Sequence, residues 1–154
     1  METIKIVKSI SWIPVILLMI LIFYFSQQPV TISNDLSMGI TEPIIQIIET
    51  ATPIENVSED MINHIVRKNA HFFLYFFLGI FVLIGLKKSG VRGTRSVMHA
   101  LFLSVIFAIS DEVHQLFVAG RGASIKDVLI DSMGATIGIL IVSIISYVGE
   151  NRKK

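Results

Sequence analysis

The sequence contains no cysteine, and charged side chains make up only 16% of its 154 residues. The absence of cysteine excludes disulfides, thiolate metal sites, CxxC redox chemistry and cysteine nucleophiles. Soluble domains carry about 25% charged residues. This chain is 53% hydrophobic, has a mean hydropathy of +0.72 and lacks the charge for a water-facing surface. Its net charge of +1 offers no basic surface for nucleic acid. The composition predicts one integral membrane domain over residues 1–154 and no nucleic-acid partner.

Four long runs with few or no charged residues divide the chain. A membrane-spanning helix needs about 20 mostly apolar residues, at a rise of about 1.5 Å each. With their flanks the four runs predict membrane helices over about 8–26, 68–87, 96–118 and 128–148. Because no small-x-small cleavage site follows the first run, we expect an uncleaved helix rather than a signal peptide. The predicted fold class is all-α, a polytopic membrane protein built on a four-transmembrane-helix bundle.

The positions of the basic residues predict the orientation of these helices. Nine of the 13 lysines and arginines lie in the two tails and in the connection between the second and third helices. The other four lie on the opposite side: Arg67, Lys68, Arg121 and Lys126. Basic residues accumulate on the cytoplasmic side of membrane proteins. The chain is therefore predicted to be a multi-pass protein of the cytoplasmic (plasma) membrane, with both termini in the cytoplasm and the first and third connections outside.

The connection between the first and second helices is the only long segment outside the predicted spans. An apolar face repeats there at helical spacing through Ile40, Ile44, Ile47, Ile48 and Ala51. This pattern predicts an amphipathic extracytoplasmic helix, bounded by Pro43 and Pro53, that lies on the outer membrane surface or covers the bundle. Ser58 is followed by two acidic residues, which is typical of a helix start. The second helix is therefore expected to begin near Ser58, well outside the bilayer.

Polar residues inside the predicted spans gather at one depth. A charge at the centre of a membrane helix costs roughly 2.5–3.5 kcal/mol on insertion scales. Charged residues in a span are therefore expected to have a functional or structural role. Residues three or four positions apart share a helix face, and each of three helices has such a polar face toward its outer end. We expect these faces to meet in one buried or half-open site. Its predicted members are Arg67, His71, Asp111, Glu112, His114, Gln115, Arg121, Asp127 and Asp131.

Three kinds of chemistry fit such a cluster. Histidine nitrogens and carboxylate oxygens could bind a divalent metal ion, although no diagnostic ligand spacing is present. A histidine and a carboxylate could perform metal-free acid–base catalysis, with the candidate catalytic residues His71, Asp111, Glu112, His114 and Asp127. Recognition alone could use the candidate substrate-binding residues Arg67, Lys68, Gln115, Arg121 and Asp131, in which arginine holds a phosphate or pyrophosphate head group. No cofactor is predicted, and the identity of any metal is left open.

A purely structural interpretation stands beside these three. Buried ion pairs, such as Arg121 with Asp127 or His71 with Asp111, could simply fix how the helices pack. Gly134 and Gly138 are one helical turn apart, and we interpret them as a point of close helix packing, within the chain or between two chains.

Two stretches of the sequence resemble the VanZ-like family. The first is Arg67-Lys-Asn-Ala-His-Phe-Phe-Leu-Tyr-Phe-Phe-Leu-Gly79. The second is Ser110-Asp-Glu-Val-His-Gln-Leu-Phe-Val-Ala-Gly-Arg121, followed by Ser124-Ile-Lys-Asp-Val-Leu-Ile-Asp-Ser-Met-Gly134. The resemblance extends over about residues 8–148. It implies a membrane protein of the bacterial cell envelope, and the name-giving member confers low-level resistance to the lipid-bearing glycopeptide teicoplanin.

The resemblance and the outer-leaflet site together predict an amphiphilic partner. A membrane lipid or lipid-linked envelope intermediate fits an anion-binding site at that depth, and so does a lipoglycopeptide. The protein would then be an envelope enzyme, with His71 or His114 as general acid/base, oriented by Asp111 or Glu112. The alternatives are a non-catalytic binder of the amphiphile and an accessory protein whose polar cluster locks the bundle. The oligomeric state is left open.

Overall fold

The structure is a computed structural model that describes residues 8–51 and 58–152, and these residues form helices and connections without a strand. Its helices are α2 Ile13–Ser26, α3 Val30–Ala51, α4 Glu59–Lys88, α5 Thr94–Gln115 and α6 Ile125–Asn151. The predicted helix end at Pro53, and Lys5, Lys153 and Lys154 of the basic tails, lie outside the described residues. The all-α fold class is confirmed.

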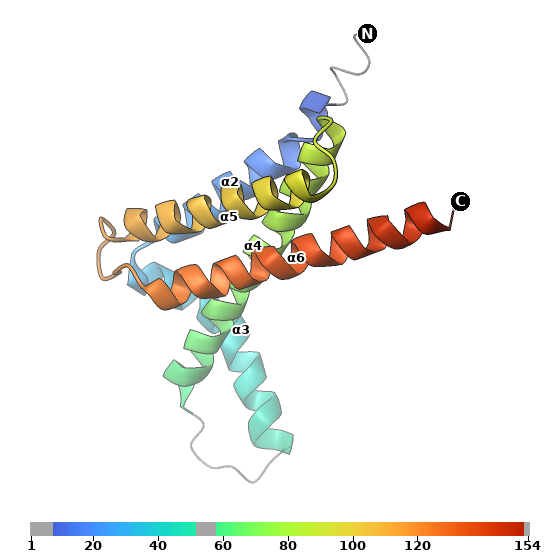
Figure 1. Ribbon diagram of the computed structural model, residues 1–154. Helices are drawn as coiled ribbons and strands as arrows, with labels where there is room; N and C mark the ends of the chain where they lie inside the picture. Colours follow the sequence, from blue (N-terminus) through green and yellow to red (C-terminus); the bar gives the residue numbers. More distant parts are fainter. Residues whose placement is uncertain (1–7, 52–57, 153–154) are drawn as a thin grey trace.

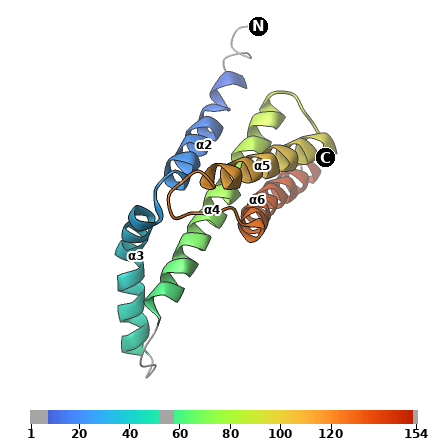
Figure 2. The same cartoon turned by 90° about the vertical axis from the view of Figure 1, so that its left-hand side faces the viewer.

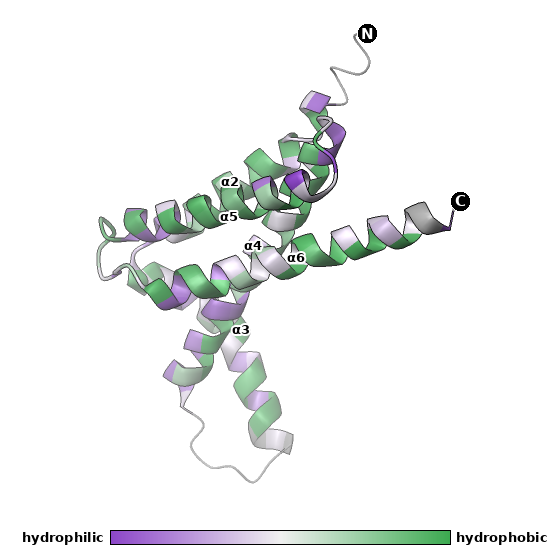
Figure 3. Cartoon of the chain, in the orientation of Figure 1, coloured by the Kyte–Doolittle hydropathy of each residue, from purple (hydrophilic) through white to green (hydrophobic). Residues whose placement is uncertain are grey.

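Four helical segments of the described chain are long and apolar enough to cross a membrane: Lys8–Ser26, Glu59–Lys88, Thr94–Gln115 and Ile125–Gly149. They correspond to the four predicted spans. Hydrophobic residues predominate along these helices (Figure 3), and many of their large apolar side chains are exposed. Leu17, Phe102 and Ile145 are each more than 60% exposed. Such a band would be unfavourable in water but suits the hydrocarbon of a bilayer.

The long helix α4 is the central element of the fold. Its C-terminal half packs against α2, α5 and α6, and its N-terminal half projects beyond them beside α3 (Figures 1 and 2). The helix begins where the sequence predicted, because Ser58 caps it by accepting a hydrogen bond from the Met61 backbone N–H at 3.4 Å. Acidic residues in its first turn and Lys87 and Lys88 in its last turn complement the helix dipole.

Helices α4 and α6 cross with their backbones in contact. A Cβ atom built on Gly134 would lie closer than 3.0 Å to the carbonyl oxygen of Phe72, and one on Gly138 would collide in the same way with that of Phe76. From the other side, a Cβ on Gly79 would meet the carbonyl oxygen of Ala135. Small residues at membrane helix crossings allow this close approach. The predicted packing role of Gly134 and Gly138 is thus confirmed within the chain.

Helix α3 packs along the projecting half of α4 through a mixed polar and apolar seam. Ser37, Thr41 and Ile45 are buried on this face. The Asn63 side-chain oxygen on α4 accepts hydrogen bonds from the hydroxyls of Ser37 and Thr41, the latter at 3.3 Å. These hydrogen bonds fix α3 against the projecting half of α4.

The bounds and the packing face of α3 differ from the prediction. Pro43 lies inside the helix instead of bounding it. Proline removes one backbone hydrogen bond and crowds the carbonyl four residues earlier. Here that residue is the exposed Gly39, whose missing side chain relieves crowding, and the packing on α4 offsets the lost bond. Ile40 and Ile47 of the predicted apolar face are 59% and 68% exposed, because α3 turns a neighbouring face toward α4.

Candidate functional site

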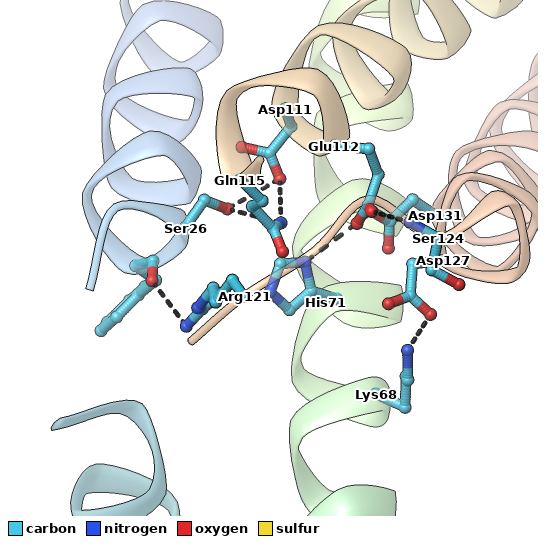
Figure 4. A network of polar contacts seen from close by, with 11 residues as sticks. Ser26, Lys68, His71, Asp111, Glu112, Gln115, Arg121, Ser124, Asp127 and Asp131 are labelled. Atoms are coloured by element: carbon cyan, nitrogen blue, oxygen red, sulfur yellow. Dashed lines mark hydrogen bonds and ion pairs between the residues drawn. The ribbon is translucent and has the colours of Figure 1, made fainter. Parts of the chain in front are cut away.

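A polar cavity of about 180 Å³ is lined by the N-terminal half of α4, the end of α5, the α5–α6 connection and the beginning of α6. Figure 4 shows the polar side chains that these elements bring together. The two connections that border it, α2–α3 and α5–α6, lie at the end of the bundle opposite the α4–α5 connection (Figure 1). Eight of the ten candidate residues line the cavity: Arg67, Lys68, His71, Glu112, Gln115, Arg121, Asp127 and Asp131. His64, which is not among these ten candidates, is also part of its wall. The polar faces of three helices therefore meet, while the chemical role of each residue remains a prediction.

Asp111 lies behind the cavity wall and is held by two side chains. Its Oδ2 atom accepts a hydrogen bond from the Ser26 hydroxyl at 2.7 Å and one from the Gln115 amide at 3.3 Å (Figure 4). Asp111 is only 2% exposed, so its carboxyl group is buried. Ser26 thus joins the last turn of α2 to α5, a contact that sequence reasoning missed. The available signal was its position, because Ser26 ends the first apolar run at the depth of the polar cluster.

Two other carboxylates tie α6 to its neighbours. Glu112 accepts a hydrogen bond from the backbone N–H of Ser124 at 2.7 Å, which fixes the approach to α6. Asp127 forms an ion pair with Lys68 and so joins α6 to α4 (Figure 4). The pair predicted as a structural alternative, Arg121 with Asp127, is therefore replaced by Lys68 with Asp127.

His71 faces Asp131 rather than forming the predicted lock with Asp111. Its Nδ1 atom lies 3.7 Å from Asp131 Oδ2, which is an ion-pair distance if the imidazole is protonated but is too long for a hydrogen bond. Asp131 is 1% exposed, and neither of its oxygens has a hydrogen-bond partner within the described part of the chain. One turn after His71, the fully buried Tyr75 also has a hydroxyl without a partner among the described residues.

Two arginines form the cationic side of the cavity. Arg67 donates a hydrogen bond to the side-chain oxygen of Asn34 on α3 at 2.9 Å. Arg121 donates one to the backbone carbonyl of Phe25 at 3.2 Å. Each guanidinium has five N–H donors, so these contacts leave donors for a ligand. Burial lowers the pKa of Arg121, in the α5–α6 connection, but arginine still carries its charge at neutral pH.

The second candidate histidine is turned away from the cavity. The ring of His114 stacks on Phe23 of α2, with centroids 4.3 Å apart and planes inclined by 28°. It does not line the polar cavity, and its Nε2 atom has no hydrogen-bond partner in the described ranges. Of the two histidines proposed as general acid/base, His71 is therefore the one in contact with the cavity.

An apolar groove of about 510 Å³ adjoins the polar cavity. Side chains of α3 and α4 form most of its wall, among them Leu36, Ile40, Phe73, Leu74 and Phe77. The groove and the cavity share three residues, Arg67, His71 and Arg121. An ionic compartment and an apolar one thus meet at two arginines and a histidine. The sequence could not reveal this groove, because it depends on how α3 lies against α4.

The glycine before Arg121 shapes the connection that carries this arginine. Gly120 has a φ of +75°, and a Cβ atom there would lie 2.6 Å from Val30 Cγ1. The left-handed conformation costs a non-glycine residue roughly 1–2 kcal/mol. We therefore expect Gly120→Ala to lower the free energy of unfolding by at least about 1 kcal/mol, and to lower the melting temperature in detergent. Gly122→Ala is the matched control, because nothing lies within 4 Å of its Cβ position. Equal melting temperatures for both variants would contradict this account of the connection.

A sequence model of the VanZ/LLP1 family matches residues 11–146, which include all the helices except the last residues of α6 and contain every candidate site residue. Neither a curated protein nor a solved structure matches the chain.

Proposed function

The chain belongs to the VanZ/LLP1 family, and on that premise we propose that this VanZ-like membrane protein acts on an amphiphile with an anionic head and an apolar tail. One observation carries the proposal: the polar cavity and the apolar groove meet at Arg67, His71 and Arg121. A head group in the cavity and a chain in the groove would both contact these residues. Membrane lipids and lipid-linked envelope intermediates have this chemistry.

The cations of the cavity favour a phosphate or another oxyanion as the head group. Lys68 is already paired with Asp127, whereas Arg67 and Arg121 contact only neutral oxygens among the described residues. Their guanidinium groups match the geometry of phosphate oxygens and bind them through two parallel hydrogen bonds. The two arginines are therefore the proposed anion-binding residues, and Gln115 adds an amide to the wall between them.

The same arrangement supports acid–base chemistry on the bound head group. His71 lines both compartments, and the Asp131 carboxylate lies 3.7 Å from its Nδ1 atom. A carboxylate beside a histidine orients the ring and stabilises its protonated form, as acid–base catalysis requires. His71 is the proposed general acid/base and Asp131 the residue that positions it. A binder without catalysis would use the same cavity and groove. Replacement of His71 distinguishes an enzyme from such a binder, because only the enzyme needs a general acid/base at this position.

The structural alternative also has a specific observation behind it. The Lys68–Asp127 ion pair joins α4 to α6, and the Ser26–Asp111 hydrogen bond joins α2 to α5. These contacts stabilise the helix arrangement whether or not a ligand binds. Helix packing alone does not explain why Arg67 and Arg121 line a cavity. Binding of an amphiphile explains it, and we therefore prefer that interpretation.

We further propose that the site faces the outer leaflet and that the protein contributes to teicoplanin tolerance. A susceptible bacterial strain producing the wild type should tolerate more teicoplanin but no more vancomycin. Arg121→Gln should abolish the difference at unchanged membrane abundance, because the anion-binding fork is lost. Arg95→Gln, at an exposed arginine in the first turn of α5, is the control and should behave as wild type. If the wild type leaves teicoplanin tolerance unchanged, this part of the proposal fails, and a lipid of the envelope becomes the ligand to seek.

A further inference from the structure

Three possible metal ligands from three helices converge at the wall of the polar cavity. They are His71 of α4, Asp111 of α5 and Asp131 of α6, and one donor atom of each lies within 4.8 Å of the others. Ligand atoms about 2.1 Å from a shared Zn²⁺ in a tetrahedral site are roughly 3.4 Å apart. The donors are thus close enough for modest side-chain rotations to bring them onto one ion.

The two aspartates have oxygens that the described protein leaves without partners. Asp131 is 1% exposed, and both of its oxygens lack a hydrogen bond from any described residue. Asp111 is 2% exposed, and its Oδ1 atom is also without a described partner, although Ser26 and Gln115 hold Oδ2. Burying an unsatisfied carboxylate is costly, and buried charges are usually paired or bound to a metal. A cation is therefore the partner that suits these oxygens best.

No lysine or arginine of the described residues forms an ion pair with Asp111 or Asp131. Lys68 is paired with Asp127, Arg67 with Asn34 and Arg121 with the carbonyl of Phe25. Only His71 lies within ion-pair distance of one of the two aspartates in the described part of the chain. A divalent ion would balance both carboxylates and would accept the imidazole nitrogen as a third ligand.

We infer that His71, Asp111 and Asp131 form a binding site for one divalent transition-metal ion, such as Zn²⁺ or Mn²⁺. One nitrogen and two oxygen donors suit these ions better than Mg²⁺ or Ca²⁺, which prefer oxygen ligands. Three protein ligands leave a coordination position, as in catalytic rather than structural zinc sites. His71 and Asp131 also line the polar cavity, so an ion held by them would lie at its wall. Ser26 and Gln115 position the Asp111 ligand.

The test measures binding of the metal alone to the full-length protein purified in detergent. After treatment with EDTA and desalting, the protein is titrated with Zn²⁺ or Mn²⁺, and bound metal is counted by mass spectrometry of the elements. The wild type should hold about one ion per chain. Replacement of an outer-shell partner typically weakens metal binding 10–100-fold. We therefore expect about a tenfold loss for Ser26→Ala, and a loss of more than about 100-fold for Asp131→Asn and for His71→Gln.

Asp35→Asn is the matched control, because Asp35 is an exposed aspartate of α3 that lines neither the cavity nor the groove. It should bind metal as the wild type does. His99→Ala, at an exposed histidine near the other end of α5, controls for adventitious histidine binding. Circular dichroism and gel filtration verify that each variant is folded. If the ligand variants do not fold, the melting temperature of the wild type provides the test. A rise on addition of metal that EDTA reverses is expected only if the site exists.

The inference is overturned if the wild type holds no ion, or if Asp131→Asn and His71→Gln bind metal as tightly as Asp35→Asn. The metal site is independent of the proposed amphiphile. It would replace the general acid/base role proposed for His71, because an imidazole that ligates the ion is no longer available to transfer protons. Metal binding with no lipid binding would support the metal site and contradict the proposed function. Lipid binding without metal binding would support the proposed function and contradict the metal site.

Discussion

Replacing Gly134 by leucine should prevent folded protein from accumulating in the membrane. The Gly134 Cα faces the backbone carbonyl of Phe72 so closely that even a methyl group would collide with it. Backbone atoms cannot rotate away, so α4 and α6 must separate. Overpacking by single methylenes costs typically about 1–3 kcal/mol, and four added carbon atoms against a backbone should exceed the upper end of that range. The loss would also pull Asp131 away from His71, because both residues lie within one turn of the crossing.

The same helix offers a matched control for this prediction. Gly149 lies near the end of α6, and nothing is found within 4 Å of its Cβ position. Gly149→Leu should therefore accumulate and elute from gel filtration as the wild type does. Gly134→Ala should give an intermediate melting temperature. A Gly134→Leu protein with normal abundance and melting temperature would contradict the close crossing of α4 and α6.

Removing both cavity arginines should have the largest effect on ligand binding. A hydrogen bond to a charged group contributes about 1.5–3 kcal/mol, so loss of two should weaken binding of an anionic lipid by about 100-fold or more. The test compares Arg67→Ala/Arg121→Ala with the wild type, using dioctanoyl phosphatidylglycerol and purified protein in detergent. Native mass spectrometry or thermophoresis reports the dissociation constant.

Two exposed arginines at the other end of the molecule supply the control. Arg92 lies in the α4–α5 connection and Arg95 in the first turn of α5, and both are exposed. Arg92→Ala/Arg95→Ala has the same change in net charge and should bind the lipid nearly as the wild type does. If both double variants lose affinity equally, the lipid is attracted by overall charge, and the cavity is not its binding site.

The spans and the meeting of the polar faces were predictable because both follow from local rules. Apolar length determines where a helix can cross a bilayer. Helical spacing places Asp127 and Asp131 on one face, and topology places that face at the same end as His71 and Asp111. Ser58 was recognisable as a helix start because its cap and acidic first turn are local features. The close packing at Gly134 was predictable for the same reason, since small residues one turn apart are a local signal.

What the sequence could not predict depends on tertiary contacts. The passage of α3 through Pro43 relies on the packing of Thr41 and Ile45 against α4, which no local pattern encodes. His114 has helical spacing suited to the site, yet the ring of Phe23 from α2 holds it outside the cavity. The ion-pair partner of Asp127 was not predictable either, because Lys68 rather than Arg121 reaches this carboxylate.

The apolar groove is the feature that most changes the interpretation of the polar cluster. Polar residues alone fit an enzyme, a binder or a helix lock. A groove of about 510 Å³ that shares Arg67, His71 and Arg121 with the cavity adds a place for an apolar chain next to the place for an anion. The central claim is therefore that one amphiphile occupies both compartments.

The most direct test of this claim is photocrosslinking with an anionic phospholipid that carries a diazirine in one acyl chain. The account predicts labelling concentrated on the groove wall, at Leu36, Ile40 and Phe73, and strongly reduced labelling in Arg67→Ala/Arg121→Ala. Labelling spread evenly over the exposed apolar band, including Phe102 and Ile145, and unchanged in that variant, would show that the lipid only surrounds the helices and would contradict the account.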